Sequence, residues 1–226
     1  MPSTDSLFTQ AQRDRVTAAV RDAESKTSAQ IVPVIARASG RYDRAEDIAG
    51  LWLGIVFLIV AWFLYPLPQV EEDSWGGSPA VIQLMCMIIA LIVGFFLGAI
   101  LADKCRPLRR LFTPRRQMID EVAARARMAF FDQTLHHTAG ATGLLIFISL
   151  YEHRAAVLSD QAVLDKLGQP AVQSLCDELT AALKNGDTIE ALCVTIALAG
   201  EKLGPVLPRE AGDVNELDDA LVVIDG

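Results

Sequence analysis

The stretch QIVPVIARASGRYDRAEDIAGLWLGIVFLIVAWFLYP, residues 30–66, passes from a strand-like pattern to membrane-like composition within one continuous segment. Residues 30–38 are rich in Val and Ile, which is typical of a β-strand. From Leu51 to Pro68 no side chain is charged, and a helix over this run would be roughly 27 Å long, close to the ~30 Å hydrocarbon thickness of a bilayer. The short helix and strand that precede this run cannot form a stable core, so the rest of their domain must lie later in the chain.

A second apolar run covers Ala80–Leu101, with Gln83 as its strongly polar residue. As a helix it would be roughly 33 Å long. Two buried helices of a soluble protein are the alternative, but two such runs in succession, with aromatic residues near their ends, favour membrane spans. We therefore expect a transmembrane hairpin over residues 48–104, with spans at about 51–68 and 80–101 joined by a loop at 69–79.

The distribution of charge orients this hairpin. The loop at 69–79 contains three acidic residues and no Lys or Arg, whereas basic residues lie on both outer flanks, at Arg37, Arg41 and Arg44 and within residues 104–116. Cytoplasmic flanks of membrane spans carry an excess of Lys and Arg. We expect a two-pass protein of the inner (plasma) membrane, with both termini cytoplasmic and the lipid bilayer as its first partner.

The overall composition excludes one class of function. The 226 residues carry a formal net charge of −8, and the basic residues near 104–116 are explained by membrane topology. A nucleic-acid-binding face needs clustered positive charge, so no nucleic-acid partner is expected. The four cysteines form no CxxC pair, which favours reduced thiols over a disulfide framework.

The two segments outside the hairpin, residues 1–47 and 105–226, fit one discontinuous domain, because a two-span hairpin returns the chain to the side it left. Helical and strand patterns alternate along them. The expected elements are a helix capped by Thr9 and ending near Lys26, a strand at 30–38, a helix from Thr113–Pro114 to His136, strands at 143–150 and 154–160, a helix from Pro170 to Lys184, and a helix capped by Asp187 and ending near Leu203. This order predicts a layered α/β sandwich with a mixed sheet.

Two strand features refine this expectation. The continuous apolar run GLLIFISL, residues 143–150, predicts a strand buried on both faces. The short link to residues 154–160 predicts an antiparallel hairpin. Pro33 cannot donate a ladder hydrogen bond, so the first strand is expected at a sheet edge or with a bulge there.

Four stretches in order carry a resemblance to a known family: TSAQIVPVI (27–35), residues 130–138, GLLIFISLYEHRAAVLSD (143–160) and NELDD (215–219). They resemble the TPM domain family, which is named for a thylakoid lumen phosphatase, a photosystem II repair protein and a nematode modulator of acetylcholine receptors. The resemblance covers the sequence on both sides of the hairpin. It implies a Rossmann-like three-layer α-β-α sandwich, here interrupted by the transmembrane hairpin.

Three residues depart from the family pattern. Gln30 stands where relatives usually carry Glu, Ala162 where a Gly usually follows the Asp, and Asp218 where the family motif has Pro. Each lies near a region that relatives are thought to use for metal or substrate. The departures put catalytic competence in doubt more than the fold.

Asp160 and the acidic tail are the candidate metal ligands. Asp160 follows a predicted strand, and Asn215, Glu216 and Asp219 could add the hard oxygen ligands that calcium, magnesium and manganese prefer. Such a cation could polarise a phosphoryl oxygen or activate water. The alternative is that Asp160 caps the next helix and the tail acids form a solvated surface.

Arg154 is the candidate phosphate or substrate contact, because its planar guanidinium suits two parallel hydrogen bonds. An ion pair with Glu152 or Asp160 is an equally good explanation. His136 and His137 are adjacent on a predicted helix and point about 100° apart, so favourable interaction with the helix C-terminus explains them better than a shared metal.

Two functions from different classes remain. The first is a non-enzymatic, membrane-tethered factor that binds other membrane proteins and assists their assembly or quality control. The second is a divalent-metal-dependent phosphatase. The degraded motif positions and the absence of a nucleophile motif or Gly-rich phosphate loop favour the first.

Overall fold

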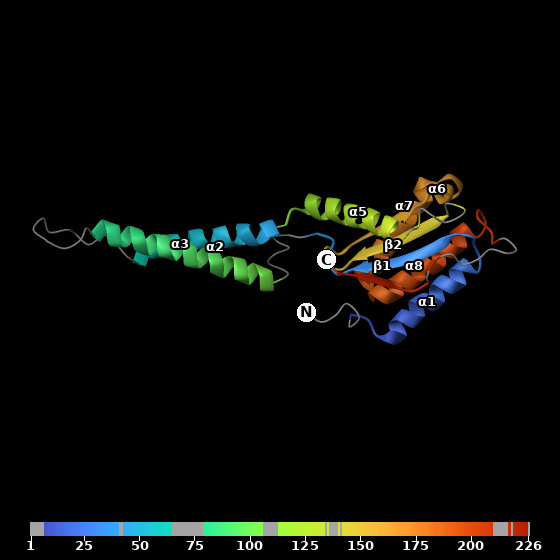
Figure 1. Ribbon diagram of the computed structural model, residues 1–226, viewed down its shortest axis with the longest axis horizontal. Coiled ribbons are helices and arrows are strands. Elements are labelled where there is room, and N and C mark those ends of the chain that lie inside the picture. Colours follow the sequence, from blue (N-terminus) through green and yellow to red (C-terminus); the bar gives the residue numbers. More distant parts are fainter. Residues whose placement is uncertain are drawn as a thin grey trace, which may run out of the picture. The chain divides into compact units, whose positions relative to one another are not determined.

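A computed structural model describes residues 7–40, 43–64, 79–105, 113–133, 135, 140, 142–209, 217 and 219–225. The chain divides into two compact units (Figure 1). One combines residues 1–40 with 118–226, and the other is formed by residues 41–117.

The first unit is built on a mixed four-stranded sheet. Its strands are β1 (Gln30–Ala36), β2 (Gly143–Ser149), β3 (Arg154–Ser159) and β4 (Val222–Ile224), in the order β3-β2-β1-β4. β1 pairs in parallel with both β2 and β4, and β2 pairs antiparallel with β3. The predicted mixed sheet and the antiparallel β2–β3 hairpin are therefore confirmed.

Helices pack on both faces of this sheet (Figure 1). One face carries α1 (Gln10–Glu24), α7 (Gln169–Asn185) and α8 (Thr188–Leu203), while α5 (Arg115–Asp132) packs on the other. Alternate strand residues serve the two cores, as the period of two requires. Ile31, Ile35, Leu144, Ile146 and Ile148 face the first group of helices, and Val32, Val34, Ala36, Leu145 and Phe147 face α5.

The position of Pro33 differs from expectation, because β1 is an interior strand. The backbone explains how an interior strand tolerates proline. Gln30 N–H donates toward β2, to Thr142 O at 3.2 Å, and Arg37 N–H donates toward β4, to Ile224 O at 3.1 Å. Because strand residues alternate, the nitrogen of Pro33 points to the β4 side, where pairing begins only at Val34. The missing N–H therefore costs no hydrogen bond within the β1–β4 ladder.

Element ends follow local chemistry. The predicted capping box of α1 is confirmed: Gln12 N–H donates to Thr9 Oγ1 at 3.3 Å, and Thr9 N–H donates to Gln12 Oε1 at 2.9 Å. The helix expected to reach His136 ends as α5 at Asp132, and His136 and His137 lie outside the described residues. Two short elements were not predicted, namely β4 and the seven-residue helix α6 (Gln161–Leu167).

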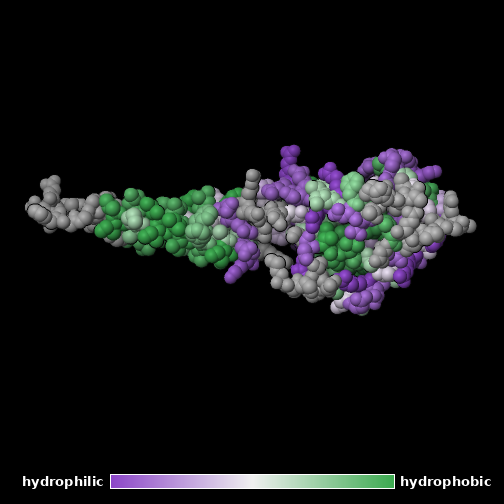
Figure 2. Space-filling view, in the orientation of Figure 1, coloured by the Kyte–Doolittle hydropathy of each residue, from purple (hydrophilic) through white to green (hydrophobic). Residues whose placement is uncertain are grey.

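The second unit is a pair of antiparallel helices, α2 (Asp43–Leu64) and α3 (Pro79–Lys104). The segments Glu46–Leu64 and Val81–Lys104 are long and apolar enough to cross a membrane. Figure 2 shows hydrophobic residues over most of the visible surface of this pair, whereas hydrophilic residues are frequent on the sheet-containing unit.

Glycines set the contact between the two helices. A Cβ atom on Gly94 would lie 2.8 Å from the Cα of Gly54, and one on Gly98 would lie 2.8 Å from the Cα of Gly50. Each helix thus presents a Gly-x-x-x-Gly motif to the other, a pattern that allows backbones to approach closely.

Candidate functional site

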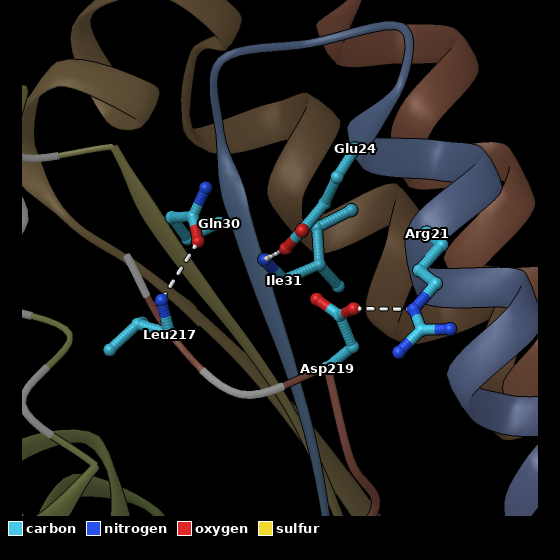
Figure 3. A network of polar contacts seen from close by, with 6 residues as sticks. All are labelled: Arg21, Glu24, Gln30, Ile31, Leu217 and Asp219. Atoms are coloured by element: carbon cyan, nitrogen blue, oxygen red, sulfur yellow. Dashed lines mark hydrogen bonds and ion pairs between the residues drawn. The ribbon is translucent and has the colours of Figure 1, made fainter. Parts of the chain in front are cut away.

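A network of buried polar groups lies where α1 ends, β1 begins and the chain approaches β4 (Figure 3). At its centre is Glu24, the last residue of α1, which is only 8% exposed. Ile31 N–H donates to Glu24 Oε1 at 2.7 Å. Like the nitrogen of Pro33, this N–H points to the side of β1 where β4 has not yet begun, so Glu24 supplies the acceptor that a strand would otherwise provide.

Asp219 completes the network from the C-terminal segment. It is also 8% exposed, and Arg21 Nε–H donates to its Oδ2 at 2.8 Å. Figure 3 shows the carboxyl group of Asp219 close to that of Glu24, so that the negative charge of Asp219 acts on Glu24.

The surroundings of Glu24 favour its protonated form. Its pKa is raised from 4.5 to about 7, chiefly because burial removes the carboxylate from water. The Ile31 N–H opposes this pKa rise, while the negative charge of Asp219 adds to it, and the positive charge of Arg209 opposes it. Below about pH 7, Glu24 is therefore mostly protonated and accepts a hydrogen bond from Ile31 N–H, while Arg21 forms an ion pair with Asp219.

Gln30 ties a further part of the C-terminal segment to β1. Its side chain is buried, and Leu217 N–H donates to its Oε1 at 3.3 Å. A glutamate at this position could accept the same hydrogen bond.

Asp160 caps α6, as one of the two sequence interpretations proposed. Gln161 N–H donates to its Oδ1 at 2.7 Å, and Ala162 lies in the first turn of that helix. Its other oxygen, Oδ2, is buried and has no hydrogen-bond partner within the described part of the chain. Asp160 N–H donates to Gly143 O at 2.8 Å, which holds Asp160 at the end of the sheet where β1 and β2 begin.

The candidate metal ligands do not converge in the described structure. Asp160 follows β3 and Asp219 precedes β4, and these strands are the two edges of the sheet. Three strand spacings separate the two backbones by roughly 14 Å, which is too far for one cation to contact both carboxylates. Asn215, Glu216 and Asp218 lie outside the described residues, and among those described no three His, Cys, Asp or Glu side chains gather into a metal-binding group.

Arg154 is also remote from Asp160. It begins β3 and pairs with Ser149, at the end of the sheet where β1 and β2 finish. The six residue steps from Arg154 to Asp160 span roughly 20 Å of extended chain. An Arg154–Asp160 ion pair and a single site that uses both residues are therefore ruled out by the strand itself.

A second buried network lies at this opposite end of the sheet. Glu152, only 2% exposed, accepts the hydroxyl hydrogen of Ser149 at Oε2 and Ser39 N–H at Oε1, the latter at 2.8 Å. The Ser39 hydroxyl in turn donates to Ser149 Oγ at 2.8 Å. This network fastens the β2–β3 turn to the segment that follows β1, the last described backbone before the chain enters α2.

Sequence reasoning missed Glu24 and did not give Glu152 its structural role. A signal for Glu24 was present, because Val16, Val20 and Glu24 share one helical face at intervals of four residues. An acid on the inner face of a helix indicates a buried partner. Glu152 offered no comparable signal, since a residue in a hairpin turn is expected at the surface.

Comparison with solved structures finds a similar fold in the BA42 protein of the psychrophilic bacterium Bizionia argentinensis, determined by NMR. The TM-score is 0.56 at 15% sequence identity, and the match covers 99% of each chain. At this identity the likeness concerns the fold alone. No family model and no curated protein matches the chain.

Proposed function

We propose that this protein is a membrane-tethered factor in which a TPM-like, three-layer α-β-α domain binds other membrane proteins and assists their assembly or quality control without catalysing a reaction. The main observation that supports this proposal is the position of the two apolar helices in the chain. They lie between β1 and β2, which pair with each other along their whole length. The hairpin therefore anchors the domain through two covalent connections.

The alternatives for the apolar helices fit less well. A core helix of a soluble protein is mostly buried. In the most apolar 18-residue stretch of each helix, however, only 17% is buried in α2 and 11% in α3. A cleaved signal sequence cannot separate two strands that pair in the mature protein. A two-pass hairpin in the inner (plasma) membrane, with cytoplasmic termini as the flanking charges predict, satisfies both the exposure and the chain order.

The polar chemistry of the domain supports a binding role. The oxygens of Glu24 and Glu152 accept hydrogen bonds from the main chain, and Asp219 is held by Arg21. These acids hold segments of the domain in place. Arg154 and Asp160, the candidate phosphate and metal contacts, stand at opposite ends of β3.

Photo-cross-linking in native membranes, followed by affinity purification, tests this proposal. The full chain is compared with a hairpin-only control that retains residues 41–117. We expect membrane proteins that are recovered with the full chain and absent from the control. Recovery of the same proteins with both would assign binding to the hairpin, and recovery of none would remove the binding proposal.

One observation favours the alternative of a metal-dependent phosphatase. The buried Oδ2 of Asp160 has no partner among the described residues, and a carboxylate oxygen of this kind suits a calcium, magnesium or manganese ion. Titration of each metal into the full chain, with the melting temperature as readout and Asp160→Asn as control, decides the point. A stabilisation lost in Asp160→Asn, together with phosphoester hydrolysis, would favour the enzyme.

A further inference from the structure

The helix α5 carries apolar side chains on the face that points away from the sheet. Its inner face is formed by the buried residues Met118, Val122, Ala126 and Ala129. On the outside, Ala124, Met128 and Phe131 are exposed and follow one another at intervals of four and three residues, so they line one side of the helix. We call these three residues the outer stripe.

The outer stripe is unusual within the sheet-containing unit. Five large apolar side chains of its described part are exposed, and two of them, Met128 and Phe131, belong to the outer stripe, whereas Ile119 lies on another side of α5. Met128 is 51% and Phe131 58% exposed. Single exposed apolar residues are common, but their concentration on one helix indicates a surface that is covered in the cell.

Charge identifies the covering surface. Residues 104–119 contain six basic residues, with the first acid of α5 at Asp120, and the exposed Arg127 lies beside the outer stripe, next to Met128. Basic residues close to a membrane span are attracted to anionic headgroups, and apolar side chains beside them can enter the headgroup region. Ten residues, 105–114, connect α3 to α5, and they can extend by at most about 35 Å. The start of α5 is therefore within reach of the bilayer surface.

We propose that the outer stripe of α5 binds an anionic lipid surface, with Met128 and Phe131 entering the headgroup region and Arg127 contacting lipid phosphates. This inference rests on the proposed membrane tether. It adds a second attachment, which would restrict the movement of the domain about the hairpin and leave the helices on the other face of the sheet available to protein partners.

The test places the photo-reactive residue p-benzoylphenylalanine at single positions of the full chain, reconstituted into vesicles of phosphatidylcholine with or without phosphatidylglycerol. Phe131 is the test position. Val194 is the matched control, because it is 57% exposed and lies on α8, which packs on the opposite face of the sheet. Ile59, 48% exposed on α2, reports whether the hairpin contacts lipid at all.

We expect lipid adducts at position 131 but not at 194, with a yield that rises with phosphatidylglycerol. The Arg127→Gln change should weaken this contact about fivefold at low salt, since one basic residue near an anionic surface contributes about 1 kcal/mol. Lipid adducts at 59 with none at 131 would overturn the inference and leave the tether intact. Their absence at both positions would remove the tether as well. Cross-linking of position 131 to a second copy of the chain, or a yield independent of phosphatidylglycerol, would also overturn it.

Discussion

The hairpin and the sheet-containing unit achieve close packing by opposite means. In the hairpin, Gly50 and Gly54 face Gly98 and Gly94, and the helices touch because side chains are missing. In the other unit, large side chains such as Phe147 fill the space between sheet and helices. Water makes burial of large apolar groups favourable, whereas in lipid the exposed and buried states are equally apolar and close van der Waals contact decides. This contrast is the one that the proposed membrane location of the hairpin predicts.

The largest expected effect is a loss of stability confined to the sheet-containing unit. Phe147→Ala removes a fully buried ring from the core between the sheet and α5 and should lower the free energy of unfolding by about 3–5 kcal/mol. Hydrogen exchange would show faster exchange of the β1 and β2 amides while exchange in α2 and α3 stays unchanged. Val194→Ala, an exposed substitution on α8, is the control and should stay within about 0.5 kcal/mol. Faster exchange in both units would contradict their independence.

The next effect uses pH to separate the units. Because the folded pKa of Glu24 is about 7 against 4.5 for the free group, its favourable contribution is complete below pH 4.5 and is lost as pH rises to 7. The loss amounts to about 3 kcal/mol. Between Leu51 and Leu101, the described hairpin helices contain Cys86 as their one titratable side chain, so hairpin stability should not change over this range.

Glu24→Gln provides the matched variant for the pH measurement. The amide can still accept from Ile31 N–H, so it imitates the protonated acid without titrating. Denaturant midpoints recorded from pH 4.5 to 8 should fall for the native protein and vary much less for Glu24→Gln. Equal slopes for the two proteins would show that Glu24 does not titrate in this range.

The third effect is aimed at the hairpin. Gly94→Leu inserts a side chain where a Cβ alone would meet the backbone of Gly54, and it should destabilise the helix pair by about 1–3 kcal/mol or separate it. Phe96→Leu, at a 61% exposed position of the same helix, is the control and should have little effect. Cysteine cross-linking between α2 and α3 in detergent measures the separation. Unchanged cross-linking in Gly94→Leu would refute the glycine contact.

The smallest effect concerns one residue in the β2–β3 turn. His153 has φ of 52°, a left-handed conformation that β-branched residues adopt with difficulty. His153→Asn should leave the free energy of unfolding within about 0.5 kcal/mol, while His153→Val should reduce it by about 1–2 kcal/mol. Urea denaturation distinguishes the two variants. If His153→Val left the free energy of unfolding unchanged, the backbone of the turn would have to adopt another conformation at this position.

The strong apolar patterns predicted most of the fold. The run at residues 143–150 appears as β2, which is buried at every position, and residues 30–38 appear as β1, ending at Ala36. Both strands are buried on two faces, so their composition alone separated them from surface segments. The apolar runs at 51–68 and 80–101 likewise correspond to α2 and α3, although the described part of α2 ends at Leu64.

The missed features depend on contacts between distant segments. β4 has three residues and follows an acidic tail, so its pattern is too short to recognise, and its position is fixed by pairing with β1. Because β4 begins only opposite Val34, the interior strand β1 tolerates Pro33, and the N–H of Ile31 is free to donate to Glu24 instead of to β4. The separation of Arg154 from Asp160 likewise follows from the direction of β3, which no local pattern specifies.

The position of the hairpin between β1 and β2 also has a consequence for biosynthesis. Residues 37–142 must be translated before β2 exists, which takes on the order of ten seconds at ordinary elongation rates. Throughout that interval the edges of β1 have no strand to pair with, and a strand in this state can join the strands of other nascent chains. Pro33 removes one donor from an edge of β1, and Glu24, already synthesised, can occupy another. The two residues that accommodate the late start of β4 would thus also protect the first strand while the ribosome completes the rest of the sheet.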